Sequence, residues 1–247
     1  MSEQRQKTER FPEAEREALY KIVFSRRDVR GQFTSEPVSD EIVSRILHAA
    51  HYAPSVGFMQ PWDFIVIRSK DVRQRVRDAF ERAHGEAAEM FPEDKRETYK
   101  SLKLEGILES SLNICVTCDR TRSGETVIGR THDPTMDVYS SVCAVQNLWL
   151  AARSEGLGVG WVSIFDPDEV RGILELPANI VPIAYLCVGW VDYFHAKPEL
   201  ELAGWLPRLQ LEELVHFEKW GGAGDGDADS SLMERIREHA PFPDIQE

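Results

Sequence analysis

The segment Thr135–Ser154 constrains the fold more than any other part of the chain. Its apolar residues recur at helical spacing and cover much of the circumference of the helix that they predict. Such a helix is typical of the centre of a domain or of an interface, because a solvent-facing helix is apolar along one stripe only. The residues available for burial are Val138, Val142, Val145, Leu148, Trp149 and Ala152.

Shorter elements surround this helix without a regular alternation of strands and helices. Apolar, partly β-branched runs predict strands at Trp62–Ile67, Leu112–Cys118, the second half of Gly156–Ser163, and Ile180–Val191. Helices are predicted over Glu13–Ser25, over about Ser39–Tyr52, and after Asp166, where Glu169 would complete a capping box. This helix-rich order favours an α+β fold over a regular βαβ series.

Residues 71–108 predict a highly charged, mostly helical segment that is interrupted at Gly85 and Pro92. Its middle part, about residues 82–104, has too little apolar surface to be a core element. This insertion is therefore either a solvated helical pair or a lid over a site. In a lid, the apolar residues expected to cover a ligand are Met90 and Phe91.

Residues 10–220 are predicted to form one domain, and residues 221–247 a flexible C-terminal tail. Glycine, aspartate and serine dominate Gly221–Ser231, so this stretch has almost nothing to bury. A short amphipathic piece follows around Leu232–Glu238.

Composition argues against two classes of partner. The 247 residues carry a formal net charge of −13, whereas general nucleic-acid binders and anionic-membrane binders need a broad positive surface. Met1–Arg10 lacks the apolar core of a signal peptide, and no later run is long enough to cross a bilayer. The pair Cys115 and Cys118 has no second pair to complete a zinc site. We expect a reduced, cytoplasmic protein without a metal.

The run Arg26-Arg27-Asp28-Val29-Arg30 places three fixed cations within five residues of an otherwise acidic chain. Guanidinium groups keep their charge and offer a planar fork of donors that matches phosphate oxygens. The run is either a solvated basic loop or an anion-binding site. A local anion pocket is compatible with the negative net charge.

Three further segments carry candidate site residues. Ala53-Pro54-Ser55 leads into Gln60-Pro61-Trp62 just before a predicted strand, and Pro207-Arg208-Leu209 lies near the end of the domain. Gly156, Gly158 and Gly160 lack the spacing of a dinucleotide fingerprint, and they precede a strand instead of opening a helix. Alone, these glycines predict a tight helix-to-strand connection with Gly156 as the C-cap.

Taken together, in this order and spacing, the four segments resemble the flavin-binding pattern of the nitroreductase family. The resemblance covers roughly residues 10–220. It implies a nitroreductase-like α+β fold with a mixed, mostly antiparallel central sheet flanked by helices. It also implies a domain-crossing homodimer with FMN at the subunit interface.

The resemblance also assigns roles to individual residues. The FMN phosphate would be held by Arg26, Arg30 and Arg208, and Arg27 would lie near the pyrimidine edge of the flavin, where a cation stabilises the reduced anionic ring. Hydrogen bonds to the flavin would come from Ser55 and Gln60, of the same subunit or of the partner. The N5 edge would be lined by Val162, Ser163 and Ile164, and the rest of the cavity by Val29 and Leu108.

Two departures from the family pattern point to one branch of it. Asp28 replaces the usual small hydroxyl residue, and Phe58 stands about where an asparagine is usual. With the charged insertion, these features resemble the branch that consumes reduced FMN and oxygen and makes 5,6-dimethylbenzimidazole, the lower ligand of cobalamin. Erythrose 4-phosphate is the by-product that this resemblance implies, and a flavin reductase would supply the reduced FMN.

Asp28 and Ser163 are the expected catalytic residues. A carboxylate beside three arginines should stay ionised and could accept a proton near the junction of ring and ribityl chain. Its other interpretation is a structural salt bridge to Arg27 or Arg30. Ser163 would direct oxygen to the flavin. The alternative functions are an NAD(P)H-dependent nitro or flavin reductase that recycles its FMN, and a flavin-binding protein without enzymatic activity.

Overall fold

The structure is a computed structural model that describes residues 9–224 and 226–238. Its contacts divide it into a larger unit that ends at Phe194 and a smaller unit that begins at His195. This division falls before the predicted domain limit at residue 220. Within the described residues, no helix combines the length and the apolar character that crossing a bilayer requires.

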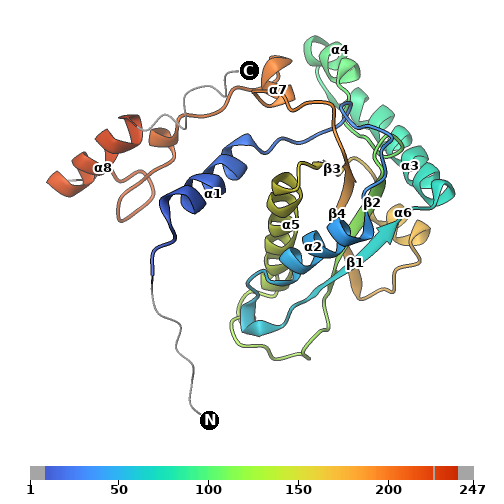
Figure 1. Ribbon diagram of the computed structural model, residues 1–247, viewed down its shortest axis with the longest axis horizontal. Helices are drawn as coiled ribbons and strands as arrows, with labels where there is room; N and C mark the ends of the chain where they lie inside the picture. Colours follow the sequence, from blue (N-terminus) through green and yellow to red (C-terminus); the bar gives the residue numbers. More distant parts are fainter. Residues whose placement is uncertain (1–8, 225, 239–247) are drawn as a thin grey trace. The chain divides into compact units, whose positions relative to one another are not determined.

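Four strands form the sheet at the centre of the larger unit (Figure 1). They are β1 (Trp62–Ile67), β2 (Leu112–Asp119), β3 (Gly158–Val162) and β4 (Ile180–Gly189), in the spatial order β1-β2-β4-β3. Every neighbouring pair is antiparallel. A parallel pairing occurs only as the isolated bridge between Asp28 and Val159 among the described residues. The predicted α+β fold is confirmed.

Two helices cover one face of this sheet: α5 (Met136–Ser154) and α2 (Asp40–His51). Their inner residues pack on alternate sheet residues in one cluster, with Leu148 of α5 completely buried. Burial of a leucine side chain contributes about 1.5–3 kcal/mol, so α5 anchors this layer, as the sequence predicts. Part of α5 nevertheless faces outward, because Tyr139 and Val142 are exposed.

The opposite face of the sheet packs against α3 (Lys70–Met90) and α6 (Pro167–Ile173). The predicted interruption at Gly85 is wrong, because α3 continues through it. One glycine costs a helix only about 1 kcal/mol, which the packing of Val76 and Phe80 offsets. The chain does break at Pro92, after which α4 (Glu93–Ser101) begins.

Cys115 and Cys118 face opposite sides of β2, as their spacing predicts. Cys115 lies in the cluster under α3, and Cys118 contacts Ser141 of α5. Burial raises the pKa of the thiols of Cys115 and Cys187 to about 12. Both thiols therefore stay protonated and act as small apolar groups.

The remaining elements are α1 (Glu13–Ser25), η1 (Val56–Phe58), α7 (Glu199–Leu202), η2 (Leu211–Glu213) and α8 (Asp227–Glu238). The short amphipathic piece predicted around Leu232–Glu238 lies in α8, which begins earlier, at Asp227. The flexibility predicted for the tail from residue 221 stays a prediction. Residues 225 and 239–247 of that tail lie outside the described part.

The N-terminus of α6 departs from its predicted capping box. Asp166 caps it by accepting the main-chain N–H of Asp168 at 2.8 Å. Glu169 instead pairs with Arg82 of α3. This ion pair connects the two helices on that face of the sheet.

Candidate functional site

The arginine run leaves the end of α1 and lies along the free edge of β3. The main-chain N–H of Val29 donates to the oxygen of Val159 at 3.0 Å, and Phe33 forms a bridge with Val191. The run is therefore an ordered extension of the sheet, and a solvated loop does not describe it.

Two glycines of β3 make this close approach possible. A Cβ atom at Gly160 would lie 2.1 Å from the main-chain oxygen of Val29, and one at Gly158 would lie 2.5 Å from Val191. The sequence predicted only a helix-to-strand connection here. That interpretation holds for Gly156, which has φ +87° after α5. The sequence did not predict that the other two glycines accommodate the arginine run.

Asp28 is held through both carboxylate oxygens. Oδ1 accepts the main-chain N–H of Trp161 at 2.9 Å, and Oδ2 pairs with Nη2 of Arg30 at 2.5 Å. The Asp28 side chain is 31% exposed and that of Arg30 only 11%. The predicted salt-bridge interpretation is therefore correct in geometry, with Arg30 as a partner, and the carboxylate keeps an accessible side.

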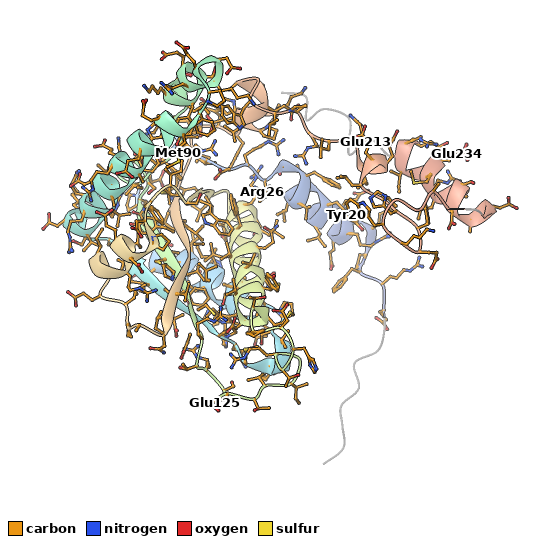
Figure 2. All side chains as sticks on the ribbon, turned by 180° about the vertical axis from the view of Figure 1, so that it is seen from behind. Tyr20, Arg26, Met90, Glu125, Glu213 and Glu234 are labelled. Atoms are coloured by element: carbon orange, nitrogen blue, oxygen red, sulfur yellow. The ribbon has the colours of Figure 1, made fainter. Side chains whose placement is uncertain are left out.

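The other two arginines are also ordered. The guanidinium of Arg26 lies over the ring of Trp149, 4.8 Å from its centroid. Arg27 donates from Nη1 to the main-chain oxygens of Phe24 and Arg26, both at 2.8 Å. Figure 2 shows Arg26 at the end of α1, where the helix gives way to the run. The fold thus fixes the three cations along one short segment.

Ser163 follows the end of the same strand on which Asp28 is anchored. Val162 is buried at the end of β3, Ser163 is exposed directly after it, and Ile164 is half-buried against the cluster under α3. Trp161, the residue that holds Asp28, lies only two positions before Ser163. One strand thus positions both predicted catalytic residues.

Leu108 lies in the loop that follows α4 and is 40% exposed. The same loop touches the arginine run, because a Cβ at Gly106 would lie 2.6 Å from the main-chain oxygen of Arg30. The loop that carries Leu108, a predicted flavin contact, therefore lies against the arginine run, which is predicted to bind the phosphate.

Ser55 and Gln60 lie in a tight turn between α2 and β1. The hydroxyl oxygen of Ser55 accepts the main-chain N–H of Gln60 at 3.1 Å, and Phe58 and Gln60 have positive φ angles. The turn borders a cavity of about 600 Å³ that Trp62 also lines. In Figure 1 this turn and the end of α1 lie at different ends of the larger unit.

These features can be compared with known proteins. A model of the nitroreductase family matches residues 23–190, more than half of the chain. The chain belongs to the nitroreductase family. The predicted family and fold are thus confirmed.

Relatives within the nitroreductase family include two enzymes of one name. The 5,6-dimethylbenzimidazole synthase of Rhodospirillum rubrum is 41% identical over 198 residues, which is 80% of this chain and 93% of that protein. The protein of the same name from Rhodobacter capsulatus is 34% identical over 202 residues, covering 82% of this chain and 97% of that one. The crystal structure of oxidized iodotyrosine deiodinase, bound to FMN and 3-iodo-L-tyrosine, superposes with a TM-score of 0.65 at 22% identity. It covers 81% of this chain and 99% of its own.

Two predicted parts of the flavin site remain predictions in this family member. Arg208 is exposed and belongs to the smaller unit, so its place beside Arg26 and Arg30 stays a hypothesis. Met90, at the end of α3, is 81% exposed (Figure 2). Phe91 instead packs against Tyr99 of α4, with ring centroids 4.5 Å apart and the rings tilted by 32°. Phe91 therefore stabilises the α3–α4 pair, and the role of a lid stays untested.

Proposed function

We propose that this protein fragments reduced FMN with molecular oxygen into 5,6-dimethylbenzimidazole, erythrose 4-phosphate and a fragment that carries the pyrimidine part of the ring system. The observation that carries the proposal is the carboxylate of Asp28, which is fixed within the arginine run and on the strand that leads to Ser163. The 41% identity to a protein named 5,6-dimethylbenzimidazole synthase supports the same conclusion.

The residues present fit a flavin mononucleotide. The run carries three guanidinium groups and one carboxylate within a chain of net charge −13, so it is a local positive site suited to a phosphate. Gly160 leaves room for the run to lie against β3. We assign the phosphate to Arg26, Arg30 and Arg208, and the pyrimidine edge to Arg27. The apolar contacts would come from Leu108 and Ile164, while Val29 and Val162, each 2% exposed, would support the run and the strand behind them.

Asp28 would act from a fixed position. One oxygen is held by the main chain at Trp161 and the other by Arg30. The free-energy cost of reorienting the carboxylate when the substrate binds is therefore small. Its exposed side can accept a proton from the bound molecule. Reduced flavin supplies the electrons that oxygen takes up. The exposed hydroxyl of Ser163 would orient the oxygen by a hydrogen bond.

A homodimer is the second part of the proposal. The turn that holds Ser55 and Gln60 lies apart from the arginine run in one protomer (Figure 1), so we assign these hydrogen bonds to the flavin of the partner subunit. Exposed apolar side chains support this assembly. Phe58 and Ile128 are exposed on segments that touch each other, and a second copy would bury them.

A reaction that destroys its flavin needs a continuous supply. We therefore propose that a separate flavin reductase delivers reduced FMN, with oxygen as the co-substrate. The two alternative functions make different demands. A nitro or flavin reductase retains its FMN and consumes NAD(P)H continuously. A flavin-binding protein leaves the amounts of both FMN and NAD(P)H unchanged.

The fate of the flavin separates these functions. Reduced FMN is mixed with the purified protein without oxygen, air is admitted, and the flavin absorbance is followed with and without NADH. The proposal predicts that flavin is lost in proportion to the protein's turnovers, without a requirement for NADH when reduced FMN is supplied. Full recovery of FMN with steady NADH oxidation would establish a reductase, and full recovery without it a binding protein.

A further inference from the structure

Arg73 is a buried cation that the proposed chemistry does not use. It lies on α3 and is 6% exposed. Its Nε donates to the main-chain oxygen of Ile107 at 2.9 Å, and its Nη2 donates to the oxygens of Ile107, Leu108 and Ser110 at 2.7, 2.8 and 2.5 Å. All these acceptors belong to one turn, so a single guanidinium organises it.

The geometry favours arginine over lysine at this position. A buried charge is costly unless its donors are satisfied, and the planar fork of a guanidinium reaches several carbonyl oxygens at once. A lysine ammonium is a point charge with three donors on one nitrogen. Its nitrogen ends one atom short of the position of Nη2 and it has no counterpart of Nε, so it would lose part of the contacts that Arg73 makes with the oxygens of Ile107, Leu108 and Ser110.

Glu105 anchors the same turn from its other side. This carboxylate is 2% exposed, and its Oε2 accepts the main-chain N–H of Ile107 at 2.8 Å. Its Oε1 pairs with Lys103 at 2.5 Å and with Arg77 at 3.3 Å. Residues 105–111, which we call the clamped turn, are thus fixed through both their N–H and their carbonyl groups.

The clamped turn packs directly against the arginine run of the candidate site. A Cβ atom at Gly106 would lie 2.6 Å from the main-chain oxygen of Arg30 and 2.6 Å from the ring of Phe33. No side chain fits between the turn and the arginine run. Leu108 is a proposed flavin contact, and its carbonyl oxygen accepts a hydrogen bond from Nη2 of Arg73.

We propose that Arg73 is a positioning residue for the flavin site. By fixing the clamped turn, it sets where Leu108 and Arg30 meet the flavin, although it does not touch the flavin itself. This inference rests on the proposed function. Without Arg73, the carbonyl oxygens of Ile107, Leu108 and Ser110 lose the guanidinium that holds them together. The turn then rearranges and withdraws from Arg30.

The first test uses the unaltered protein. Hydrogen–deuterium exchange is measured with and without oxidised FMN, and peptides covering residues 26–33 and 104–111 are compared. We expect both to gain protection with FMN, because the clamped turn borders the flavin. Protection at 26–33 alone overturns the positioning role and leaves the flavin site intact. If neither peptide gains protection, the proposed flavin site itself is contradicted.

The second test uses variants on α3. Arg73→Met and Arg73→Lys are compared with Arg75→Met, which changes an exposed arginine of the same helix. Each variant is titrated with FMN below its unfolding temperature, and the visible circular dichroism of the bound flavin is recorded. We expect the Kd to rise at least about tenfold for Arg73→Met, with an altered dichroism, and to stay unchanged for Arg75→Met.

The Lys variant keeps the test decisive if Arg73→Met does not fold. A folded Arg73→Lys protein should also bind FMN more weakly and show an altered flavin dichroism. A purely structural role lowers only the unfolding midpoint. A folded Arg73→Lys protein with the Kd and dichroism of the unaltered protein would therefore overturn the proposal.

Discussion

The substitution Asp28→Asn separates the structural from the chemical role of this carboxylate. The new amide oxygen can still accept the N–H of Trp161, which Asp28 binds at 2.9 Å. The amide nitrogen takes the place of Oδ2, and as an uncharged donor it cannot accept from Arg30, whose guanidinium lies 2.5 Å from Oδ2. The variant therefore keeps the shape of the site and loses one ion pair.

The expected cost in stability follows from the burial of that pair. Breaking a fully buried ion pair costs about 3–5 kcal/mol, and breaking an exposed one about 0–1 kcal/mol. The Asp28 side chain is 31% exposed and its partner 11%, so we expect the free energy of unfolding to fall by about 1–2 kcal/mol. A protein with this loss remains folded at room temperature.

The effect on turnover should be much larger. A positioned general base contributes about 10²–10⁴-fold to a rate, so formation of 5,6-dimethylbenzimidazole should fall by about that factor while reduced FMN still binds. The assay combines denaturant unfolding, flavin titration without oxygen, and product quantification by chromatography. Asp168→Asn, at an exposed carboxylate on α6, is the matched control. Unchanged turnover in a destabilised Asp28→Asn protein would show that the residue is only structural.

Three further predictions concern β3, the residue that follows it, and the charged insertion. Gly160→Ala should lower the unfolding midpoint and abolish FMN binding, because its Cβ would lie 2.1 Å from the main-chain oxygen of Val29. The control is Gly85→Ala, where no atom lies within 4 Å of the new Cβ. This control should stabilise α3 by up to about 1 kcal/mol. Wild-type affinity in Gly160→Ala would contradict the packing argument. Ser163→Gly should slow product formation and lower the free energy of unfolding only by the roughly 0.4–1 kcal/mol that a new glycine costs, because the exposed hydroxyl supports no packing. An unaltered rate would remove Ser163 from the mechanism. Limited proteolysis of residues 82–103 should slow when FMN is added, and cleavage indifferent to flavin would count against a lid.

Local patterns predicted the elements whose packing is simple. Helix α1 and strand β1 have the predicted bounds, and α5 differs by one residue, because continuous periodicity and flanking polar residues define them. Gly85 was misjudged since its cost as an isolated residue is small beside the packing of the helix that contains it.

Contacts between residues that lie far apart in the chain could not be predicted from local sequence patterns. The need for glycine at Gly160 comes from Val29, which lies far away in the chain. The sequence shows Arg73 only as one of many charged residues on α3, and the fold is needed to show that its side chain is buried against the turn at Ile107. Asp28 was singled out by its place among arginines, but its bond to Trp161 depends on how the run pairs with β3.

The central claim is that the carbon atoms of the aromatic product come from the flavin. A single turnover with reduced FMN that carries ¹³C at every carbon of its ring system and ribityl chain, followed by admission of air and mass spectrometry, tests it most directly. The account predicts fully labelled 5,6-dimethylbenzimidazole, formed in proportion to the flavin lost. Recovery of all the label as intact FMN would contradict it.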